Sequence, residues 1–481
     1  MQIKQLKIKS FRGIKDLALE FNSEQPNLLI GVNGSGKSSI LDCLAILLSH
    51  FTEPIRNPDS SGDFFGEEDI NNENKDGIAS AEIIANIGDW AKPSAKSDRE
   101  IKWSLTKTRE GNNNDLAAIS DVVDNTKNKI IEDADFALPI ITHYTVNRVV
   151  RDIPLRVRKK NLFETKDAYY KSLARGGISF GDFFEWFRNQ EDIENEERSN
   201  LFLKSLNELV AVMVEKFLKE QNLHHKLSQH SSNEGSTEFE SDIINILKQS
   251  DNPNENFQST PKLFYNYQLE AVRKAIGSIL DGFSNLRVQR RPLKMIVEKQ
   301  GKKLYINQLS DGEKCLLAMV GDLARRLAIA NPGLENPLQG SGVVLIDEIE
   351  LHLHPQWQRN IILRLQETFP NCQFIITTHS PQVISGVKYV TLLDVTPEGI
   401  TAEQIPSYGK DSNRVLETIM GTSSRPQKIM EDLQQLFELI DRGNLDDARQ
   451  LRDRIAEEME DQDPEFTKAD WLIERKEILK Q

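Results

Sequence analysis

Residues 31–38 read GVNGSGKS, in which glycine is followed, after four intervening residues, by glycine, lysine and serine. Glycines let backbone N–H groups curl around phosphate oxygens, which a Cβ would obstruct. Lys37 would add a positive charge beside the β- and γ-phosphates, and Ser38 a hydroxyl for Mg²⁺. The pattern predicts a nucleotide-binding loop with contacts from Asn33, Gly34, Ser35, Gly36, Lys37, Ser38 and Ser39.

The residues on either side of this loop predict a strand before it and a helix after it. Residues 27–30 are a short apolar run, which is typical of a buried strand. Within 38–49 the apolar residues recur at helical spacing, so a helix N-terminus would face the same anion. The order strand, loop, helix is the context that a phosphate-binding loop needs, and it disfavours an accidental glycine-rich turn.

A second candidate site lies in the stretch VVLIDE at 343–348, where four apolar residues end in two acids. A buried strand of this kind would deliver Asp347 to the Mg²⁺ ion. Glu348 would then polarise the attacking water as a general base. The alternative is a strand that simply ends in two solvated acids, and the loop upstream favours the catalytic interpretation.

Three further stretches carry polar residues in suggestive places. LSDGE at 309–313 opens a predicted helix and could present Ser310 to an anion, although alone it fits an ordinary N-cap with Glu313. His379 follows another apolar run, where a lone histidine is usually structural. ELHLHP at 350–355 is weak support for zinc, and a helix start fixed by Pro355 is preferred.

Composition limits the class of protein. The chain has 481 residues, with 60 Lys and Arg against 74 Asp and Glu, a net charge of −14. This argues against a surface that binds nucleic acid throughout, but not against a local basic patch. Its three cysteines are far apart, so no disulfide framework is indicated. No signal peptide or long apolar run is present, and we expect a cytoplasmic protein without a membrane segment.

The segment between the two motif regions has a different character. Residues 161–260 contain an aromatic cluster at 183–187, which favours helix packing over base stacking, and then helical stretches without sustained heptads. We therefore expect a helical insertion without a long coiled-coil arm. The basic run 148–160 could contact nucleic-acid phosphates or form a solvated face. Its candidate contacts are Arg148, Arg151, Arg156, Arg158, Lys159 and Lys160.

Taken in this order, the motifs resemble those of the SMC/RecF/OLD-like branch of ABC ATPases, over about 1–158 and 262–395. The resemblance implies an α/β fold: an ABC-type P-loop ATPase head split by a helical insertion, with a C-terminal helical tail. The implied divisions are 1–158 for the N-terminal half of the head, 159–261 for the insertion, 262–420 for the C-terminal half, and 421–481 for an acidic αα-hairpin.

The resemblance also implies roles for residues. Arg12 would contact the nucleotide and His379 would sense its γ-phosphate. Two heads would sandwich two ATP molecules with Mg²⁺, so a homo-oligomer built on head-to-head dimers is expected. The signature residues that would act on the other subunit's ATP are Ser310, Asp311, Gly312 and Glu313. One departure is that the glutamine expected near the end of 138–148 is missing, and Asn147 is its candidate substitute.

Within this branch the sequence looks most like the Septu-type antiphage ATPases called PtuA, also found in some retron systems. Zinc-hook repair ATPases need a long coiled coil with CxxC, and OLD nucleases need a Toprim domain; neither is predicted here. The Septu group works with a separate HNH nuclease, PtuB, and retrons add a reverse transcriptase with its RNA/DNA product. The resemblance thus implies a regulatory ATPase that is not itself a nuclease. The alternative is a RecF-type repair or recombination ATPase that binds DNA directly.

Overall fold

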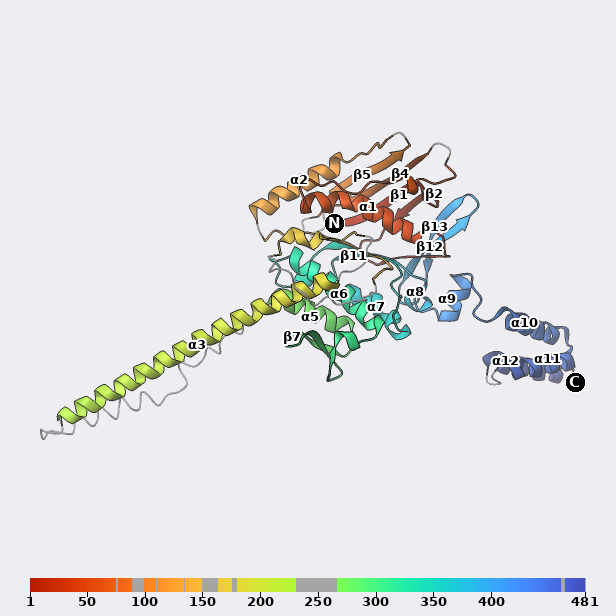
Figure 1. Cartoon of the computed structure of the whole chain (residues 1–481). Coiled ribbons are helices and arrows are strands. Elements are labelled where there is room, and N and C mark those ends of the chain that lie inside the picture. Colours follow the sequence, from red (N-terminus) through yellow and green to blue (C-terminus); the bar gives the residue numbers. More distant parts are fainter. Residues whose placement is uncertain are drawn as a thin grey trace.

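The protein is described by a computed structural model (Figure 1). Its described residues are 1–74, 77–88, 99–109, 111–133, 135–148, 163–174, 180–230, 266–459 and 463–480. Of the predicted nucleic-acid contacts, Arg151, Arg156, Arg158, Lys159 and Lys160 lie outside them. No helix within these ranges is long and apolar enough to cross a membrane.

A six-stranded, mostly parallel sheet forms the centre of the head and confirms the predicted α/β class. Its edge strand β13 runs antiparallel to its neighbour. Parallel strands are covered on both faces, which explains why every residue of the run that ends at Ile346 is buried. In spatial order the strands are β13 (Gly399–Pro406), β12 (Tyr389–Thr396), β3 (Asn27–Gly31), β11 (Cys372–Thr377), β10 (Gly342–Ile346) and β6 (Ile140–Tyr144).

A second, antiparallel sheet lies beside the first and shares its hydrophobic core. Helix α1 (Lys37–Arg56) contacts strands of both sheets, so the helix that follows the glycine-rich loop is held between two layers. The antiparallel strands, in spatial order, are β2 (Ile14–Glu20), β1 (Gln2–Phe11), β4 (Ile78–Asn86) and β5 (Glu100–Thr108), with helix α2 (Ala117–Glu132) packed on β5 and α1.

Helix α6 (Asp311–Ala330) is the central helix of the C-terminal half, and nearly all of its residues are buried. It packs on β6, where Tyr144 donates a hydrogen bond to the buried Asp322 over 3.1 Å. Burial opposes the ionisation of Asp322, yet the neighbouring Arg326 and Arg325 lower its pKa. The other elements of this half are α5 (Tyr267–Ile279), which packs on α6, α7 (Pro355–Thr368), α8 (Pro381–Ile384), α9 (Ser412–Thr418), and the three-stranded sheet of β7 (Phe283–Arg290), β8 (Leu293–Lys299) and β9 (Lys302–Tyr305).

Helix α3 (Phe180–His230) corrects the expectation for the insertion. It is one continuous helix of 51 residues that projects away from the head, where separate helical stretches without a long coiled-coil arm were expected (Figure 1). Its first turns carry the aromatic cluster, in which Phe183 and Trp186 are fully buried. Phe183 lies against Gly321 of α6, so the arm is packed directly on the central helix. The cluster is therefore core, as predicted.

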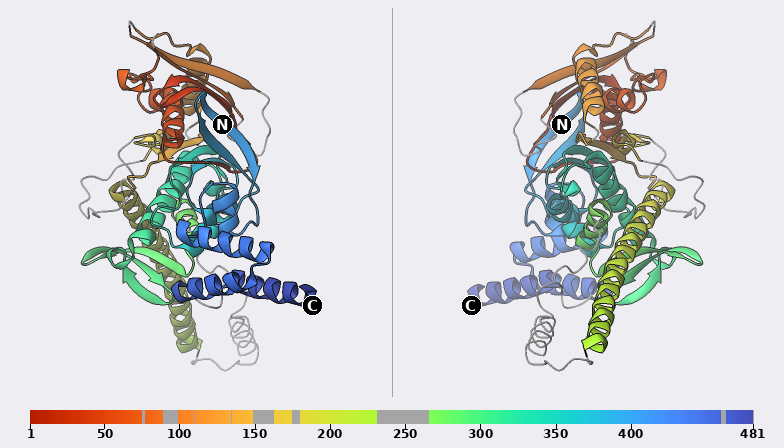
Figure 2. Two further views of the ribbon diagram at one scale, coloured as in Figure 1. Left: turned by 90° about the vertical axis from the view of Figure 1, so that its right-hand side faces the viewer. Right: turned by 90° about the vertical axis from the view of Figure 1, so that its left-hand side faces the viewer.

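The C-terminal tail is a three-helix unit, where a two-helix hairpin was expected. Gly443 ends the first helix in the left-handed conformation, which favours glycine. A third helix was missed, and the helices of this unit lie together at the C-terminal end (Figure 2). Phe466 and Ile473 of the third helix complete a hydrophobic core separate from that of the head. The helices are α10 (Gln427–Arg442), α11 (Leu445–Glu458) and α12 (Pro464–Lys480).

Candidate nucleotide-binding and hydrolysis site

The topology of the central sheet gathers the predicted motifs at one edge. Strands β3, β11, β10 and β6 are neighbours and parallel, so their carboxyl ends meet. The glycine-rich loop follows β3, the acid pair follows β10, and His379 comes two residues after β11. Open parallel sheets bind ligands at this edge. Motifs that are hundreds of residues apart in sequence thus become one candidate site.

The glycine-rich loop has the conformation that the sequence predicts. Gly36 adopts a φ of 86° directly before α1, a left-handed conformation that favours glycine. Ser38 is exposed at the start of the helix, whereas Lys37 is buried. The Lys37 ammonium donates hydrogen bonds of 2.9 Å to the carbonyl oxygens of Gly31 and Val32, at the rim of the loop. A cation is therefore held where the loop's N–H groups would meet phosphate.

The charges around Lys37 connect the loop to the acids after β10. Burial lowers the pKa of Lys37, while the carboxylates of Asp347, Glu348 and Glu350 act in the opposite direction. Such an electrostatic effect requires the three acids to lie near the ammonium. The predicted phosphate-binding and acidic elements therefore converge in space.

The two acids after β10 are held by the neighbouring strand β11. Thr377 Oγ1 accepts a hydrogen bond of 2.8 Å from the backbone N–H of Glu348 and donates one to Asp347 Oδ1. Glu348 has a φ of 48°, a left-handed conformation that costs a non-glycine residue about 1–3 kcal/mol. The structure therefore retains an unfavourable backbone at the residue predicted to be the base. Nothing in the sequence marked Thr377 as its partner.

Glu350 connects the acidic segment to the loop that carries His379. Its carboxylate accepts a 2.8 Å hydrogen bond from the Thr378 hydroxyl and another from the backbone N–H of His379. His379 is itself half-buried, beside the edge of the sheet. Because of these two hydrogen bonds, a movement of the segment after β10 would also move His379, the predicted γ-phosphate sensor. The sequence placed Glu350 only in a loop preceding a helix.

The predicted signature divides into an exposed and a buried half. Ser310 is the N-cap of α6, and it shares a capping box with Glu313. Ser310 and Asp311 are exposed, but Gly312 and Glu313 are buried within the chain. Burial opposes the ionisation of Glu313, but its interactions with Lys299 and with the N–H and hydroxyl of Ser310 together lower its pKa. That Ser310 and Asp311 act on a second subunit therefore stays a prediction. Glu313 instead forms hydrogen bonds with Lys299 and Ser310 of its own chain.

Arg12 lies between β1 and β2 and is partly exposed. Its Nε donates a 2.9 Å hydrogen bond to Asp69, and its Nη1 a 2.6 Å hydrogen bond to Asp42 of α1. Burial opposes the charged form, but these two carboxylates together raise the pKa of Arg12. Arg12 is thus anchored to the helix that follows the phosphate-binding loop, and its contact with nucleotide stays a prediction.

Arg148 corrects the prediction of a nucleic-acid contact. It is only 2% exposed, and its guanidinium donates hydrogen bonds to the backbone carbonyls of Asp347 and Glu348. A buried side chain that serves the site in this way cannot reach a nucleic-acid phosphate on the surface. Asn147, the substitute for the missing glutamine, is exposed beside it at the end of β6.

The histidines after the acid pair have a local explanation. His354 is the N-cap of α7, and its Nδ1 accepts a hydrogen bond from the N–H of Gln356. Pro355 occupies the first turn of that helix, as predicted. Within the described part of the chain no group of three His, Cys, Asp or Glu residues could hold a metal ion. The helix-start interpretation therefore accounts for this segment.

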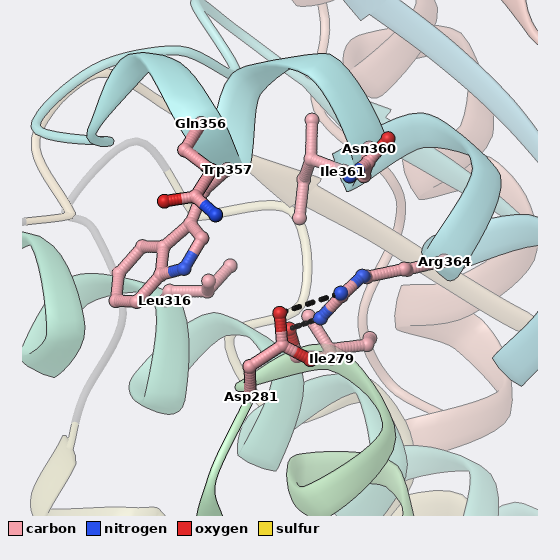
Figure 3. A pocket seen from close by; sticks show the side chains of 8 residues that line it. All are labelled: Ile279, Asp281, Leu316, Gln356, Trp357, Asn360, Ile361 and Arg364. Carbon is pink, nitrogen blue, oxygen red and sulfur yellow. Dashed lines mark hydrogen bonds and ion pairs between the residues drawn. The ribbon is translucent and has the colours of Figure 1, made fainter.

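A small pocket lies elsewhere, between α5, α6 and α7 (Figure 3). Trp357 and Leu316 form its apolar side, and Arg364 pairs with Asp281 over 2.6 Å on the other. None of the predicted site residues lines it. It is therefore separate from the candidate site at the sheet edge.

Comparisons with known proteins indicate the family of this chain. A family model described as an AAA ATPase domain matches residues 1–384. The retron Ec83 probable ATPase of Escherichia coli is 31% identical, with 99% of this chain and 87% of that protein aligned. The retron Vc95 probable ATPase of Vibrio cholerae serotype O1 biovar El Tor is 32% identical, with 90% and 83% aligned.

More distant relatives extend the comparison. The Septu protein PtuA of Bacillus thuringiensis is 24% identical, with 92% of this chain and 90% of that protein aligned. Among solved structures, an Smc head bound to the C-winged helix domain of ScpA is 15% identical, aligns with 84% of this chain and 98% of that one, and has a TM-score of 0.45. The family model and the retron relatives span most of the chain, so this protein is an ATPase that belongs to the AAA ATPase-domain family, together with the retron ATPases.

Proposed function

We propose that this chain is the ATP-driven regulatory subunit of an antiphage defence complex in which a partner HNH nuclease cuts nucleic acid. The supporting observation is a nucleotide site assembled from four strand ends in a chain that matches retron ATPases over most of its length. In this proposal 1–158 and 262–420 form one ATPase head. Residues 159–261 are the insertion that contains α3, and 421–481 are an appended helical unit.

Each site residue then has a chemical role. Lys37 and the N–H groups of the loop bind the β- and γ-phosphates. The Ser38 hydroxyl and the Asp347 carboxylate are hard oxygen donors that fit Mg²⁺, which neutralises phosphate charge when bound. Thr377 satisfies one oxygen of Asp347 and leaves the other without a hydrogen bond among the described residues, which supports this assignment. Glu348 accepts the proton of the attacking water.

Dimerisation would couple this site to regulation. Ser310 and Asp311 are exposed at the N-terminus of the 20-residue helix α6, whose dipole favours an anion. In a head-to-head pair they would face the ATP of the other copy, so ATP would close the pair and hydrolysis would open it. A partner nuclease that contacts both heads would then respond to the nucleotide state.

A reconstitution experiment tests this function. The purified chain would be combined with the HNH nuclease encoded beside it, and cleavage of phage DNA and RNA would be measured with ATP, with ADP and without nucleotide. We expect a stable complex whose cleavage depends on nucleotide, and no cleavage by this chain alone with Mg²⁺ or Mn²⁺. Cleavage by the chain alone, or a complex indifferent to nucleotide, would contradict the proposal.

Direct DNA binding would indicate the RecF-type alternative. The sequence feature that supports it is the basic run at 148–160. Arg148 is buried, so it no longer counts among the candidate contacts of that run. Binding of duplex and gapped DNA would be measured at several salt concentrations. Tight, salt-sensitive binding that is lost when Arg156, Arg158, Lys159 and Lys160 are neutralised would favour the repair function.

Thr377→Val tests the hydrogen bonds between β11 and the acid pair. Valine has nearly the same shape, but it removes the hydroxyl that holds Asp347 and the N–H of Glu348. We expect kcat for ATP hydrolysis to fall about tenfold, because a small misplacement of reacting groups is costly. Thr142→Val is the matched control, since its hydroxyl is also buried and hydrogen-bonded, donating to the Ser172 carbonyl. Equal kcat values in the two variants would argue against a role for Thr377.

A further inference from the structure

The backbone around Glu348 is unusual in that four of its polar groups are bound from two directions. Thr377 binds the two N–H groups: its Oγ1 accepts from Glu348 over 2.8 Å, and its carbonyl accepts from Ile349 over 3.1 Å. Arg148 binds the two carbonyls, those of Asp347 and Glu348, through Nη1 and Nη2. The left-handed residue is therefore fixed on both its amide and its carbonyl side.

The two partners come from the strands on either side of β10. Thr377 ends β11, and Arg148 follows β6 by four residues, so each reaches the acid pair from an adjacent parallel strand. The backbone N–H of Asp347 also donates a 2.8 Å hydrogen bond to the Tyr144 carbonyl. The ends of β6 and β10 are thus joined by a backbone hydrogen bond in addition to the two hydrogen bonds from the guanidinium.

Arginine suits this position for a geometric reason. Its guanidinium is a rigid planar fork, so Nη1 and Nη2 can bind two adjacent carbonyl oxygens together. A third hydrogen bond, of 3.3 Å, returns from Nη1 to the Thr145 carbonyl and fixes the side chain to its own turn. A lysine ammonium at the same depth has no such fork and cannot hold both carbonyls in a fixed relation.

Burying the Arg148 guanidinium is energetically unfavourable, which indicates that the residue has a role other than stabilising the fold. A guanidinium that is 2% exposed has been removed from water and placed on neutral carbonyls. Desolvating a charge is expensive, and hydrogen bonds to carbonyls recover only part of that cost. The residue stabilised by these bonds has itself an unfavourable φ of 48°. The buried guanidinium and the left-handed Glu348 therefore stabilise each other at the candidate site.

We propose that Arg148 is a positioning residue, which holds the backbone of Glu348 in the left-handed conformation and so aims its carboxylate at the attacking water. The inference rests on the proposed role of Glu348 as general base. Arg148 touches neither substrate nor water in this scheme, and it acts only through the two carbonyls. It lies four residues after β6, next to Asn147, and the sequence had predicted a nucleic-acid contact for it instead.

Arg148→Met tests the inference because methionine fills similar space without the fork. We expect kcat for ATP hydrolysis to fall about 10- to 100-fold, the scale of a displacement of roughly 1 Å, while the Kd for ATP changes less than about threefold. Arg148→Lys should recover a minor part of kcat. A merely structural role would instead lower thermal stability and ATP binding together, in both variants. Unchanged kcat in a folded Arg148→Met protein would overturn the inference.

Two comparisons separate this inference from the proposed function. Arg364→Met is the matched control, because Arg364 also binds a carbonyl, that of Ile279, away from the site; its kcat should stay near the wild-type value. In the Glu348→Gln background, Arg148→Met should cause no further fall, because both act on one step. If Glu348→Gln leaves hydrolysis unchanged, the base assignment fails. If Glu348→Gln lowers hydrolysis strongly and Arg148→Met lowers the remaining rate further by its full factor, only the positioning role fails.

Discussion

Glu348→Gln is expected to lower kcat for ATP hydrolysis by roughly 100-fold or more, the usual contribution of a general base. Glutamine keeps the shape of the side chain and the backbone bonds to Thr377 and Arg148, but it cannot accept the proton from water. ATP binding should survive, because Lys37 and the glycine-rich loop are untouched. The variant should therefore accumulate as an ATP-bound dimer, which light scattering after gel filtration would detect.

Glu350→Gln provides the control for that result. Glu350 also lies near Lys37, but its carboxylate is engaged by the Thr378 hydroxyl and the His379 N–H. Removing its charge should therefore change kcat far less than removing that of Glu348. Equal losses in the two variants would mean that the negative charge around Lys37 matters and that neither acid is the base. Unchanged turnover in Glu348→Gln would remove Glu348 from that role.

The sequence predicted the parts of the site that depend on local patterns. An apolar run that ends in a glycine-rich loop or an acid pair indicates a buried parallel strand with functional residues at its carboxyl end, so β3 and β10 were both identified. The central sheet then brings these ends together by its strand order. That order is a property of tertiary packing, and the spacing of motifs only suggested it.

The groups that the sequence missed act across strands. Thr377 and Arg148 reach the acid pair through hydrogen bonds that span 29 to 200 residues of sequence, and no periodicity records such a bond. A run of basic residues also says nothing about which member is buried, which is why Arg148 was assigned to the surface. The continuity of α3 was missed because the polar and charged stretch 191–200 separates its aromatic first turns from the apolar residues that begin at Leu201.

Gly312 was predicted to act on a second subunit. In the structure it also has a packing role within its own chain. It is buried at the start of α6, where a Cβ would lie 2.1 Å from the His352 carbonyl oxygen. That carbonyl belongs to a residue with a φ of 65°, four residues after Glu348. The close approach therefore joins the signature loop to the segment that carries the acids, and only a residue without a side chain permits it.

Gly312→Ala is therefore expected to destabilise the head without nucleotide by about 3 kcal/mol, at the upper end of overpacking costs, because the obstructing atom is backbone. It should also lower kcat by up to about 100-fold, as the segment after Glu348 is pushed aside. Chemical denaturation and steady-state ATPase assays would measure both.

Gly277→Ala supplies the contrast, since it too replaces a helical glycine but its Cβ would lie an ordinary 3.4 Å from the Phe283 carbonyl oxygen. Alanine there should be neutral or stabilise α5 by up to about 1 kcal/mol, because glycine weakens helix interiors. If Gly312 acted only on a partner's ATP, Gly312→Ala would match Gly277→Ala in stability and lose only ATP-dependent dimerisation. Loss of stability in the nucleotide-free chain would instead show that Gly312 is needed first to join α6 to the acid-bearing segment.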